Sequence, residues 1–142
     1  MMTLVVGGSA SGKSEYAEGL ILAAKSWPRS YIATMQPFDA ECLRRIEKHR
    51  RQRAEKQFET VECYTDLASA RVPTGGAVLL ECMSNLVANE LYSPEGAGEE
   101  TLSAILTGVE QLAAQCRQLV IVSNEVFSGG LDYAGDTDRY LW

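Results

Sequence analysis

The sequence predicts an α/β fold, a P-loop NTPase-like, doubly wound and mostly parallel sheet with helices on both faces. Short, continuous apolar runs alternate along the chain with longer amphipathic segments, as in parallel strands joined by helical crossovers. The first run is followed at once by a Gly- and Ser-rich segment that ends in Lys-Ser. The 142 residues, 46% of them hydrophobic, fit one domain with a substantial core.

The first strand is predicted at residues 3–6, as a buried strand, and the first helix at residues 15–25. Between them lies the G-x-x-x-x-G-K-S pattern of a phosphate-binding P-loop. Glycines at its first and sixth positions let the backbone N–H groups point at phosphate oxygens, and the helix N-terminus adds its positive end. The lysine is expected to neutralise the β- and γ-phosphates, and the serine hydroxyl to ligate Mg²⁺. The alternative, a Gly/Ser turn with an incidental lysine, has little weight, so we expect a nucleoside triphosphate to bind at Gly7, Gly8, Ser9, Ala10, Ser11, Gly12, Lys13 and Ser14.

Further β-rich runs occupy residues 30–33, 77–80 and 119–122, and the lack of polar alternation suggests strands covered on both faces. A weaker run, residues 58–62, fits either an edge or a place between two neighbours. Helices are predicted from 39 to about 53 and from 99 to about 115, with an exposed loop at 92–98.

The end of the chain, residues 135–142, has the pattern of a helix start, with Asp136 as N-cap and no room to continue. We therefore expect one nucleotide-binding domain, residues 1–142, that is cut short at its C-terminus.

The net charge of −6 argues against general nucleic-acid binding. No apolar run approaches the ~20 residues of a membrane span, and no signal peptide precedes the first strand, which favours a cytoplasmic protein without stable membrane insertion. The cysteines have no zinc-like spacing and are predicted to be reduced thiols: Cys42, Cys63, Cys82 and Cys116.

Seven of the 13 basic residues gather between positions 44 and 56, within and just beyond the second predicted helix. Leu43 and Ile46 are expected to face the core. From position 47 to 57 only Ala54 is apolar, so burial cannot hold this half of the helix. It therefore projects into water or lies over something anionic.

His49, the only histidine of the chain, lies within this basic segment. Nearby positive charge lowers the pKa of an imidazole and favours its neutral, nucleophilic form. The neighbouring arginines are suited to hold triphosphate oxygens, so the histidine is able to attack a phosphate. The residues alone nevertheless favour the alternative, a solvated charged helix with a bystander histidine.

Residues 78–81 have the form of a Walker B segment, an apolar strand that ends in the carboxylate of Glu81. At the carboxyl edge of a parallel sheet, next to a P-loop, such an acid holds Mg²⁺ directly or through water. The alternative is an ordinary strand end.

Together these segments resemble the adenosylcobinamide kinase/adenosylcobinamide-phosphate guanylyltransferase family of cobalamin biosynthesis. The matching pieces are G-G-S-A-S-G-K-S at 7–14, Y-I-A-T at 31–34, R-I-E-K-H-R at 45–50, V-L-L-E-C at 78–82 with Asn85 and Asn89 following, and V-S-N-E-V at 122–126. They span almost the whole chain.

The resemblance implies two reactions: ATP or GTP phosphorylates the aminopropanol hydroxyl of adenosylcobinamide, and GMP is then transferred from GTP onto that phosphate. It implies His49 as the nucleophile that forms a GMP phosphoramidate, Lys13 as a second catalytic residue, and Mg²⁺ held by Ser14 and Glu81. Beyond the P-loop, the implied nucleotide-binding residues are Ala33, Thr34, Met35, Arg50, Arg51, Gln52, Arg53, Glu62 and Glu81. Glu62 is a candidate for the guanine edge, with a solvent-facing edge residue as its alternative, and the role of Glu125 is left open.

The family also implies a homo-oligomer, a trimer, with a corrinoid and nucleotides as small-molecule partners. Members usually continue about 35 residues further, and residues 127–132 differ from the family pattern. The alternatives are therefore a P-loop kinase for another substrate with His49 a bystander, and a non-catalytic nucleotide-binding module.

Overall fold

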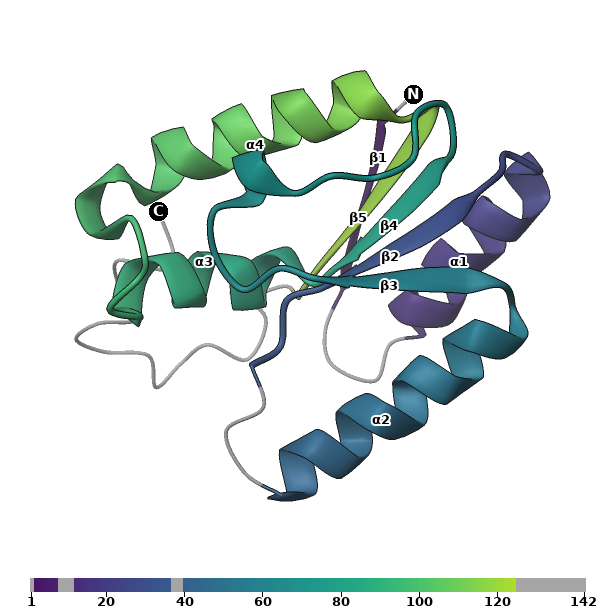
Figure 1. Cartoon of the computed structure of the whole chain (residues 1–142), viewed down its shortest axis with the longest axis horizontal. Helices are drawn as coiled ribbons and strands as arrows, with labels where there is room; N and C mark the ends of the chain where they lie inside the picture. The colour runs from purple at the N-terminus through teal and green to yellow at the C-terminus, as the bar shows by residue number, and fades with distance from the viewer. Residues whose placement is uncertain (1, 8–11, 37–39, 125–142) are drawn as a thin grey trace.

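The computed structural model describes residues 2–7, 12–36 and 40–124, with the backbone alone described at Cys42, Arg45, His49 and Asn124. Five strands form one parallel sheet in the order β1-β5-β4-β2-β3 (Figure 1). The strands are β1 (Met2–Gly7), β2 (Arg29–Ala33), β3 (Phe58–Glu62), β4 (Ala77–Glu81) and β5 (Gln118–Asn124). The helices are α1 (Lys13–Ala24), α2 (Ala40–Glu55), α3 (Met83–Tyr92) and α4 (Thr101–Gln115), with short 3₁₀ turns at Leu67–Ser69 and Gly98–Glu100. The predicted fold class is confirmed.

The sheet has a separate apolar core on each face. On one face, Ile32, Leu80 and Ile121 pack with Leu86 of α3 and Leu112 of α4. The other core contains side chains from the opposite face of the same strands, packed against Ala17 and Ile21 of α1. Helices thus cover both sides, α1 on one and α3 with α4 on the other, and α2 lies beside the β3 edge (Figure 1).

The central strands are buried, as continuous apolar runs predict: every residue from Ala77 to Leu80 is buried. The weaker run at Phe58–Glu62 is a strand with these same bounds, and it lies at the edge of the sheet, beside β2. The loop predicted at 92–98 is expected to lie between helices, and the structure gives the helix before it the bounds Met83–Tyr92. A serine and two asparagines lower the helix propensity there, so the sequence does not define these bounds.

The prediction of a buried first strand is wrong for one face of β1. Leu4 is 61% exposed and Val6 53%, while Val5, on the other face, packs against the α1 core. The cause is position, because β1 lies at an edge of the described sheet. Among residues expected to face the core, Leu43 of α2 is exposed as well.

Three of the four cysteines have described side chains, and all three are free thiols, as predicted: Cys63, Cys82 and Cys116. Among the helices of the described ranges, none is long and apolar enough to span a bilayer. The predicted helix start at 135–142 lies outside the described residues.

Candidate active site

The carboxyl ends of β2, β3 and β4 open into a cleft of about 230 Å³ next to the start of α1. Parallel strands place such a cleft where their chains leave the sheet, the usual ligand site of this class of fold. Side chains from all these elements line it: Lys13, Tyr31, Ala33, Thr34, Met35, Ile46, Arg53, Glu62, Tyr64, Glu81, Cys82, Asn85 and Val122. Seven of the residues predicted from the sequence are in this set.

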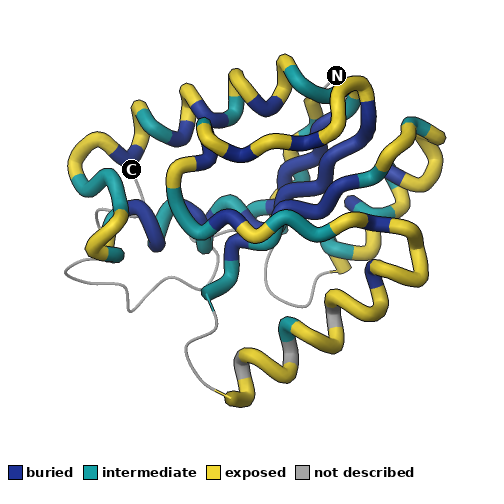
Figure 2. The backbone as a smooth tube through the Cα atoms, viewed as in Figure 1, coloured by how far each residue is buried: buried dark blue, intermediate teal, exposed yellow. Residues whose placement is uncertain are grey.

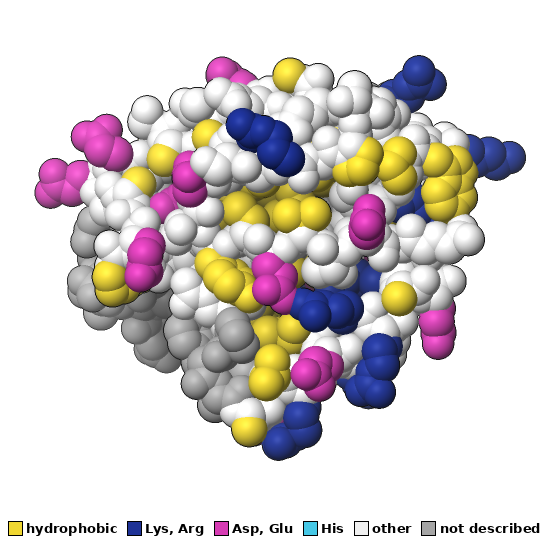
Figure 3. Space-filling view, viewed as in Figure 1, with side chains coloured by type: hydrophobic (Ala, Val, Ile, Leu, Met, Phe, Trp, Pro, Cys, Tyr) yellow, Lys and Arg dark blue, Asp and Glu magenta, His cyan; other side chains and the backbone are white. Residues whose placement is uncertain are grey.

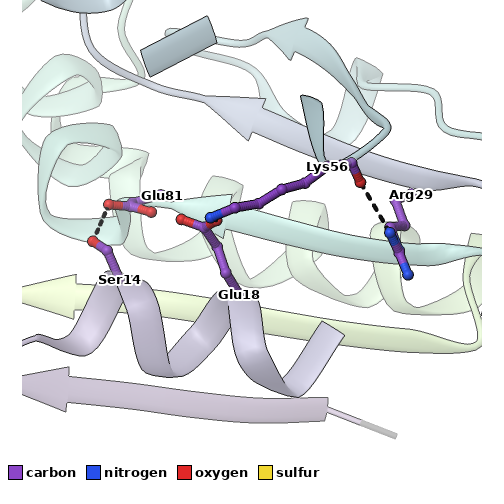
Figure 4. Close-up of polar contacts among 5 residues, drawn as sticks. All are labelled: Ser14, Glu18, Arg29, Lys56 and Glu81. Carbon is purple, nitrogen blue, oxygen red and sulfur yellow. Dashed lines mark hydrogen bonds and ion pairs between the residues drawn. The ribbon is translucent and has the colours of Figure 1, made fainter. Parts of the chain in front are cut away.

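Ser14 and Glu81, predicted as a pair at the metal, do meet. The Ser14 hydroxyl donates a hydrogen bond of 2.5 Å to Oε2 of Glu81, joining the first turn of α1 to the end of β4 (Figure 4). Gly12, with φ of 81°, takes the left-handed conformation that glycine adopts readily, and α1 begins at the next residue, Lys13. The end of β4 and the start of α1 therefore place the Glu81 carboxylate, the Ser14 hydroxyl and the Lys13 ammonium at the same side of the cleft.

A second set of bonds fixes the ends of β2 and β4 to each other. Thr34 is fully buried, and its hydroxyl donates to the carbonyl of Cys82 and accepts from the Cys82 N–H, both at 2.9 Å. The Thr34 N–H donates to the Glu81 carbonyl at 3.3 Å, and Nδ2 of Asn89 donates to the Thr34 carbonyl at 2.8 Å. Predicted as a nucleotide contact, Thr34 thus has its side chain committed to the protein, and it holds the backbone that carries Glu81.

Tyr31 and Arg53 form the inner wall of the cleft. The carbon of the Arg53 guanidinium lies 3.5 Å from the centre of the Tyr31 ring. Burial, and after it the neighbouring Glu81, raises the pKa of Tyr31 well above its usual value, so the phenol stays protonated. The Glu81 carboxylate thus lies near the Tyr31 phenol and accepts a hydrogen bond from the Ser14 hydroxyl.

Glu62 stands at the rim, at the end of β3. It forms an ion pair with Arg50 of α2, and the Tyr64 hydroxyl donates to its Oε2 at 3.2 Å. Burial, and then the Glu62 charge, raises the pKa of Tyr64. Glu62 is therefore a negative group at the cleft with two partners that fix its orientation.

The remaining predicted residues divide by position. Gly7 ends β1, and Gly12 precedes α1. Arg51 and Gln52 are exposed on α2, while Arg53 is 6% exposed. Position 49 belongs to α2, and its side chain lies outside the described residues, as do Gly8, Ser9, Ala10, Ser11 and Glu125.

Tyr64 lines the cleft although no motif contains it. Its signal in the sequence is slight, an aromatic residue two positions beyond Glu62 at the end of a weak strand. Tyr31 and Asn85 belong to matched motifs, but the sequence assigns them no role. Tyr31's contact with Glu81 joins positions 50 residues apart and depends on β2 pairing with β4.

The oxygen donors at Ser14 and Glu81 fit Mg²⁺, a hard cation that typically takes one or two protein oxygens and completes its shell with water and phosphate oxygens. Across the described residues, no group of three or more His, Cys, Asp and Glu side chains is placed to cage a metal. The donor set thus suits a metal that arrives with a nucleotide.

Basic side chains lie along α2, on the part of the surface below the sheet in Figure 3, with acidic side chains among them. Figure 2, which is coloured by burial, shows that most of this helix is exposed. Among the described side chains of residues 47–57, Ala54 is exposed and Arg53 is buried, so the expectation that apolar burial does not hold this half of the helix is confirmed.

Comparison with known proteins decides the family. The model of the cobinamide kinase / cobinamide phosphate guanyltransferase family matches residues 3–140. This chain belongs to that family. The resemblance carried by the motifs is confirmed, and the enzyme class is that of a bifunctional kinase and guanylyltransferase.

Curated members of the cobinamide kinase / guanyltransferase family are similar over most of their length. The bifunctional adenosylcobalamin biosynthesis protein CobU of Escherichia coli is 38% identical over 146 residues, covering 91% of this chain and 77% of the relative. The protein of the same name from Salmonella typhimurium is 36% identical, with the same coverage. The bifunctional protein CobP of Pseudomonas aeruginosa is 32% identical, covering 99% and 81%. Among solved structures, a KaiC-like protein from Pyrococcus horikoshii aligns with 98% of this chain and 68% of its own, at 14% identity and a TM-score of 0.49.

Proposed function

We propose that this protein phosphorylates the hydroxyl of adenosylcobinamide with ATP or GTP and then transfers GMP from GTP onto the new phosphate, giving adenosylcobinamide-GDP for cobalamin biosynthesis. The family match over residues 3–140 supports the two activities, and the names of the curated relatives support the pathway. The observation that carries the proposal is the Ser14–Glu81 pair beside a cleft lined by Lys13.

In both reactions Gly7–Ser14 binds the triphosphate. Backbone N–H groups and the ammonium of Lys13 bind the phosphate oxygens. The positive end of the α1 helix dipole lies at the same place and also favours the phosphate charge. The Ser14 hydroxyl and the Glu81 carboxylate hold Mg²⁺, which when bound neutralises charge on the phosphates. Thr34, through the bonds to Glu81 and Cys82, keeps this carboxylate in register with α1.

The first reaction needs positioning more than chemistry from the side chains. The oxygen of the substrate hydroxyl attacks the γ-phosphorus and its proton passes to solvent. The bond to the bridging oxygen breaks, and the nucleoside diphosphate leaves with that oxygen. Lys13 stabilises the charge on the transferred group. Ala33, Met35 and Asn85, which line the cleft, surround the bound molecule.

The second reaction uses His49 of α2. A neutral imidazole nitrogen forms a bond to the α-phosphorus of GTP, and pyrophosphate leaves with the bridging oxygen. An oxygen of the cobinamide phosphate then attacks the same phosphorus and the N–P bond breaks, which releases the imidazole. Arg50, Arg51 and Gln52 lie on the adjoining turn of α2 and stabilise the phosphate charge.

Glu62 supplies the preference for guanine in this second reaction. A carboxylate accepts from the N1–H and the N2 amino group of guanine, whereas adenine offers no such pair of donors at that edge. The ion pair with Arg50 and the Tyr64 hydrogen bond fix the carboxylate at the cleft rim.

The test is the intact mass of the protein after incubation with GTP and Mg²⁺. An acid-labile gain of one GMP, absent in His49→Ala and present in the control Glu95→Gln, is expected. A protein that binds GTP and gains no mass contradicts the guanylyl-transfer step and leaves a kinase. If neither GMP transfer nor cobinamide phosphorylation is seen, a nucleotide-binding module remains.

A homo-oligomer, a trimer by family resemblance, and a cytoplasmic location stay predictions. Sedimentation of the purified protein at several concentrations measures the first, with a single species of three chains as the expected result.

A further inference from the structure

Two clefts of this molecule share one wall. The first is the 230 Å³ cleft at the strand ends, and the second, of about 460 Å³, lies between α1 and the last turns of α2. Three residues line both: Tyr31, Arg53 and Glu81. The second cleft is otherwise polar and is lined by Ser14, Glu15, Glu18, Gln52, Glu55 and Lys56.

Arg53 is the unusual member of this wall. It is 6% exposed on a helix that is otherwise mostly in water, and its Nε is buried without a hydrogen-bond partner. Removing an arginine from water is costly unless other charges or a ring face take the place of the solvent. The Tyr31 ring at 3.5 Å does so, and the charges of Glu81 and Glu18 also favour the cation, although burial lowers the pKa of Arg53.

Polar contacts just after α2 attach its end to the rest of the fold. Nζ of Lys56 lies 2.6 Å from Oε1 of Glu18 on α1, and Arg29 of β2 donates to the Lys56 carbonyl at 2.9 Å (Figure 4). These contacts are exposed and individually weak. The buried contact in this group is therefore the one between Arg53 and Tyr31.

Helix geometry relates this contact to the nucleophile. Position 49 precedes Arg53 by four residues, about one turn, so both belong to the same face of α2. Docking Arg53 on Tyr31 sets the rotation of the helix about its axis. It also sets the distance of that face from Glu81, because Tyr31 and Arg53 line both clefts together with Glu81.

We propose that Arg53 is a positioning residue for guanylyl transfer: its guanidinium, stacked on Tyr31, fixes the face of α2 that carries position 49 relative to the Ser14–Glu81 pair. This rests on the proposed function. The phosphorylation step does not use position 49, so it depends less on this contact. Arg53 acts through the helix and not as a ligand of the nucleotide.

The test compares Arg53→Met, which keeps bulk over the ring and removes the charge, with Arg53→Lys, which restores a cation. Arg44→Met is the matched control, since it removes one positive charge from an exposed position of the same helix. Three quantities are measured: the single-turnover rate of GMP adduct formation, the rate of cobinamide phosphorylation with ATP, and the affinity for GTP.

We expect Arg53→Met to slow adduct formation by about 10- to 100-fold, the usual effect of a displaced reacting group. Phosphorylation and GTP affinity change by less than about threefold, Arg53→Lys recovers much of the adduct rate, and Arg44→Met behaves as the parent protein. Weaker GTP binding in Arg53→Met, matching the loss in adduct rate, would show a direct nucleotide contact and overturn the proposal. A parallel loss of both activities, which indicates a general structural role, also overturns it, as does an unchanged adduct rate.

Hydrogen exchange of the α2 amides separates this inference from the proposed function. Arg53→Met is expected to raise exchange in residues 44–52 relative to the parent protein and Arg44→Met. If the parent protein forms no adduct, the proposed guanylyl-transfer activity is contradicted. Hydrogen exchange then still reports whether Arg53 docks the helix. Unchanged exchange in Arg53→Met contradicts the docking itself.

Discussion

Glu81 joins more parts of the site than any other single side chain described above. Its carboxylate accepts a hydrogen bond from the Ser14 hydroxyl of α1, and its backbone carbonyl accepts one from the N–H of Thr34. Its side chain also lines both clefts together with Tyr31 and Arg53. A carboxylate beside the Ser14 hydroxyl is well suited to hold a cation together with the Ser14 oxygen. Removing the charge while keeping the shape tests that use.

Glu81→Gln is expected to raise the Mg²⁺ concentration that half-saturates phosphorylation by about 10- to 100-fold, because the amide keeps an acceptor and loses the charge. A Mg²⁺ titration of the initial rate measures it, with the exposed Glu95→Gln as the control. An unchanged titration in Glu81→Gln would remove Glu81 from the metal site.

Cys63 gives a pH dependence unrelated to catalysis. Burial, and then the charges of Asp66 and Glu90, raises its pKa from 9.0 to about 11. Between pH 9 and 11 the unfolded chain has released this proton and the folded chain keeps it, so the free energy of unfolding falls as pH rises.

Cys63→Ala lacks this contribution to the fall in the free energy of unfolding at alkaline pH. Urea unfolding at pH 8, 9.5 and 11 should therefore give a free energy that declines less steeply with pH than in the parent protein. A decline of equal slope in both proteins contradicts the assignment.

At the scale of elements, α4 packs closely against the Leu67–Ser69 turn. A Cβ at Gly108 would lie 2.7 Å from Cβ of Leu67 and 3.0 Å from the N of Ala68, so the helix approaches this turn as only glycine permits. Gly19 of α1 has nothing within 4 Å of such a carbon and is exposed. Packing therefore requires glycine at position 108, whereas position 19 has room for a side chain.

Gly108→Ala is expected to destabilise the protein by about 1 to 3 kcal/mol through overpacking. Gly19→Ala should stabilise it by about 0.5 to 1 kcal/mol, because alanine loses less freedom in a helix. Chemical denaturation measures the change in the free energy of unfolding for both variants. Changes of the same sign would show that Leu67 moves enough to accept the added carbon at position 108.

Elements formed by local pattern are predictable from this sequence, and long-range contacts are not. Strand β3, Phe58–Glu62, follows from its own residues, and so does helix α1 directly after Gly12. The exposure of Leu4 could not be predicted, because it depends on which strand lies beside β1. Nor could the burial of Arg53, which needs the ring of Tyr31, 22 positions earlier.

For the whole molecule, the candidate site joins α1 and α2 with residues of β2, β3, β4 and β5, so a nucleotide bound there meets four of the five strands. A ligand that binds only the folded state stabilises it by about 2.7 kcal/mol at 100 times its dissociation constant.

GTP with Mg²⁺ at such a concentration is therefore expected to raise the melting temperature by several degrees, and Lys13→Ala to lose most of that rise. Thermal unfolding with and without nucleotide measures it. An equal rise in Lys13→Ala would place the stabilising nucleotide elsewhere.

The pairing of β1 with β5 has a consequence for synthesis of the chain. Within the described sheet, β1 bonds to β5 alone, with Val5 opposite Val122. The strand that leads into the phosphate loop is thus synthesised 117 residues before its partner, since Met2 pairs with Leu119. Such distant pairing slows folding and leaves an apolar strand open to chaperones or to neighbouring chains. The nascent protein should therefore become able to bind nucleotide late, after the strands at the other edge of the sheet have been synthesised.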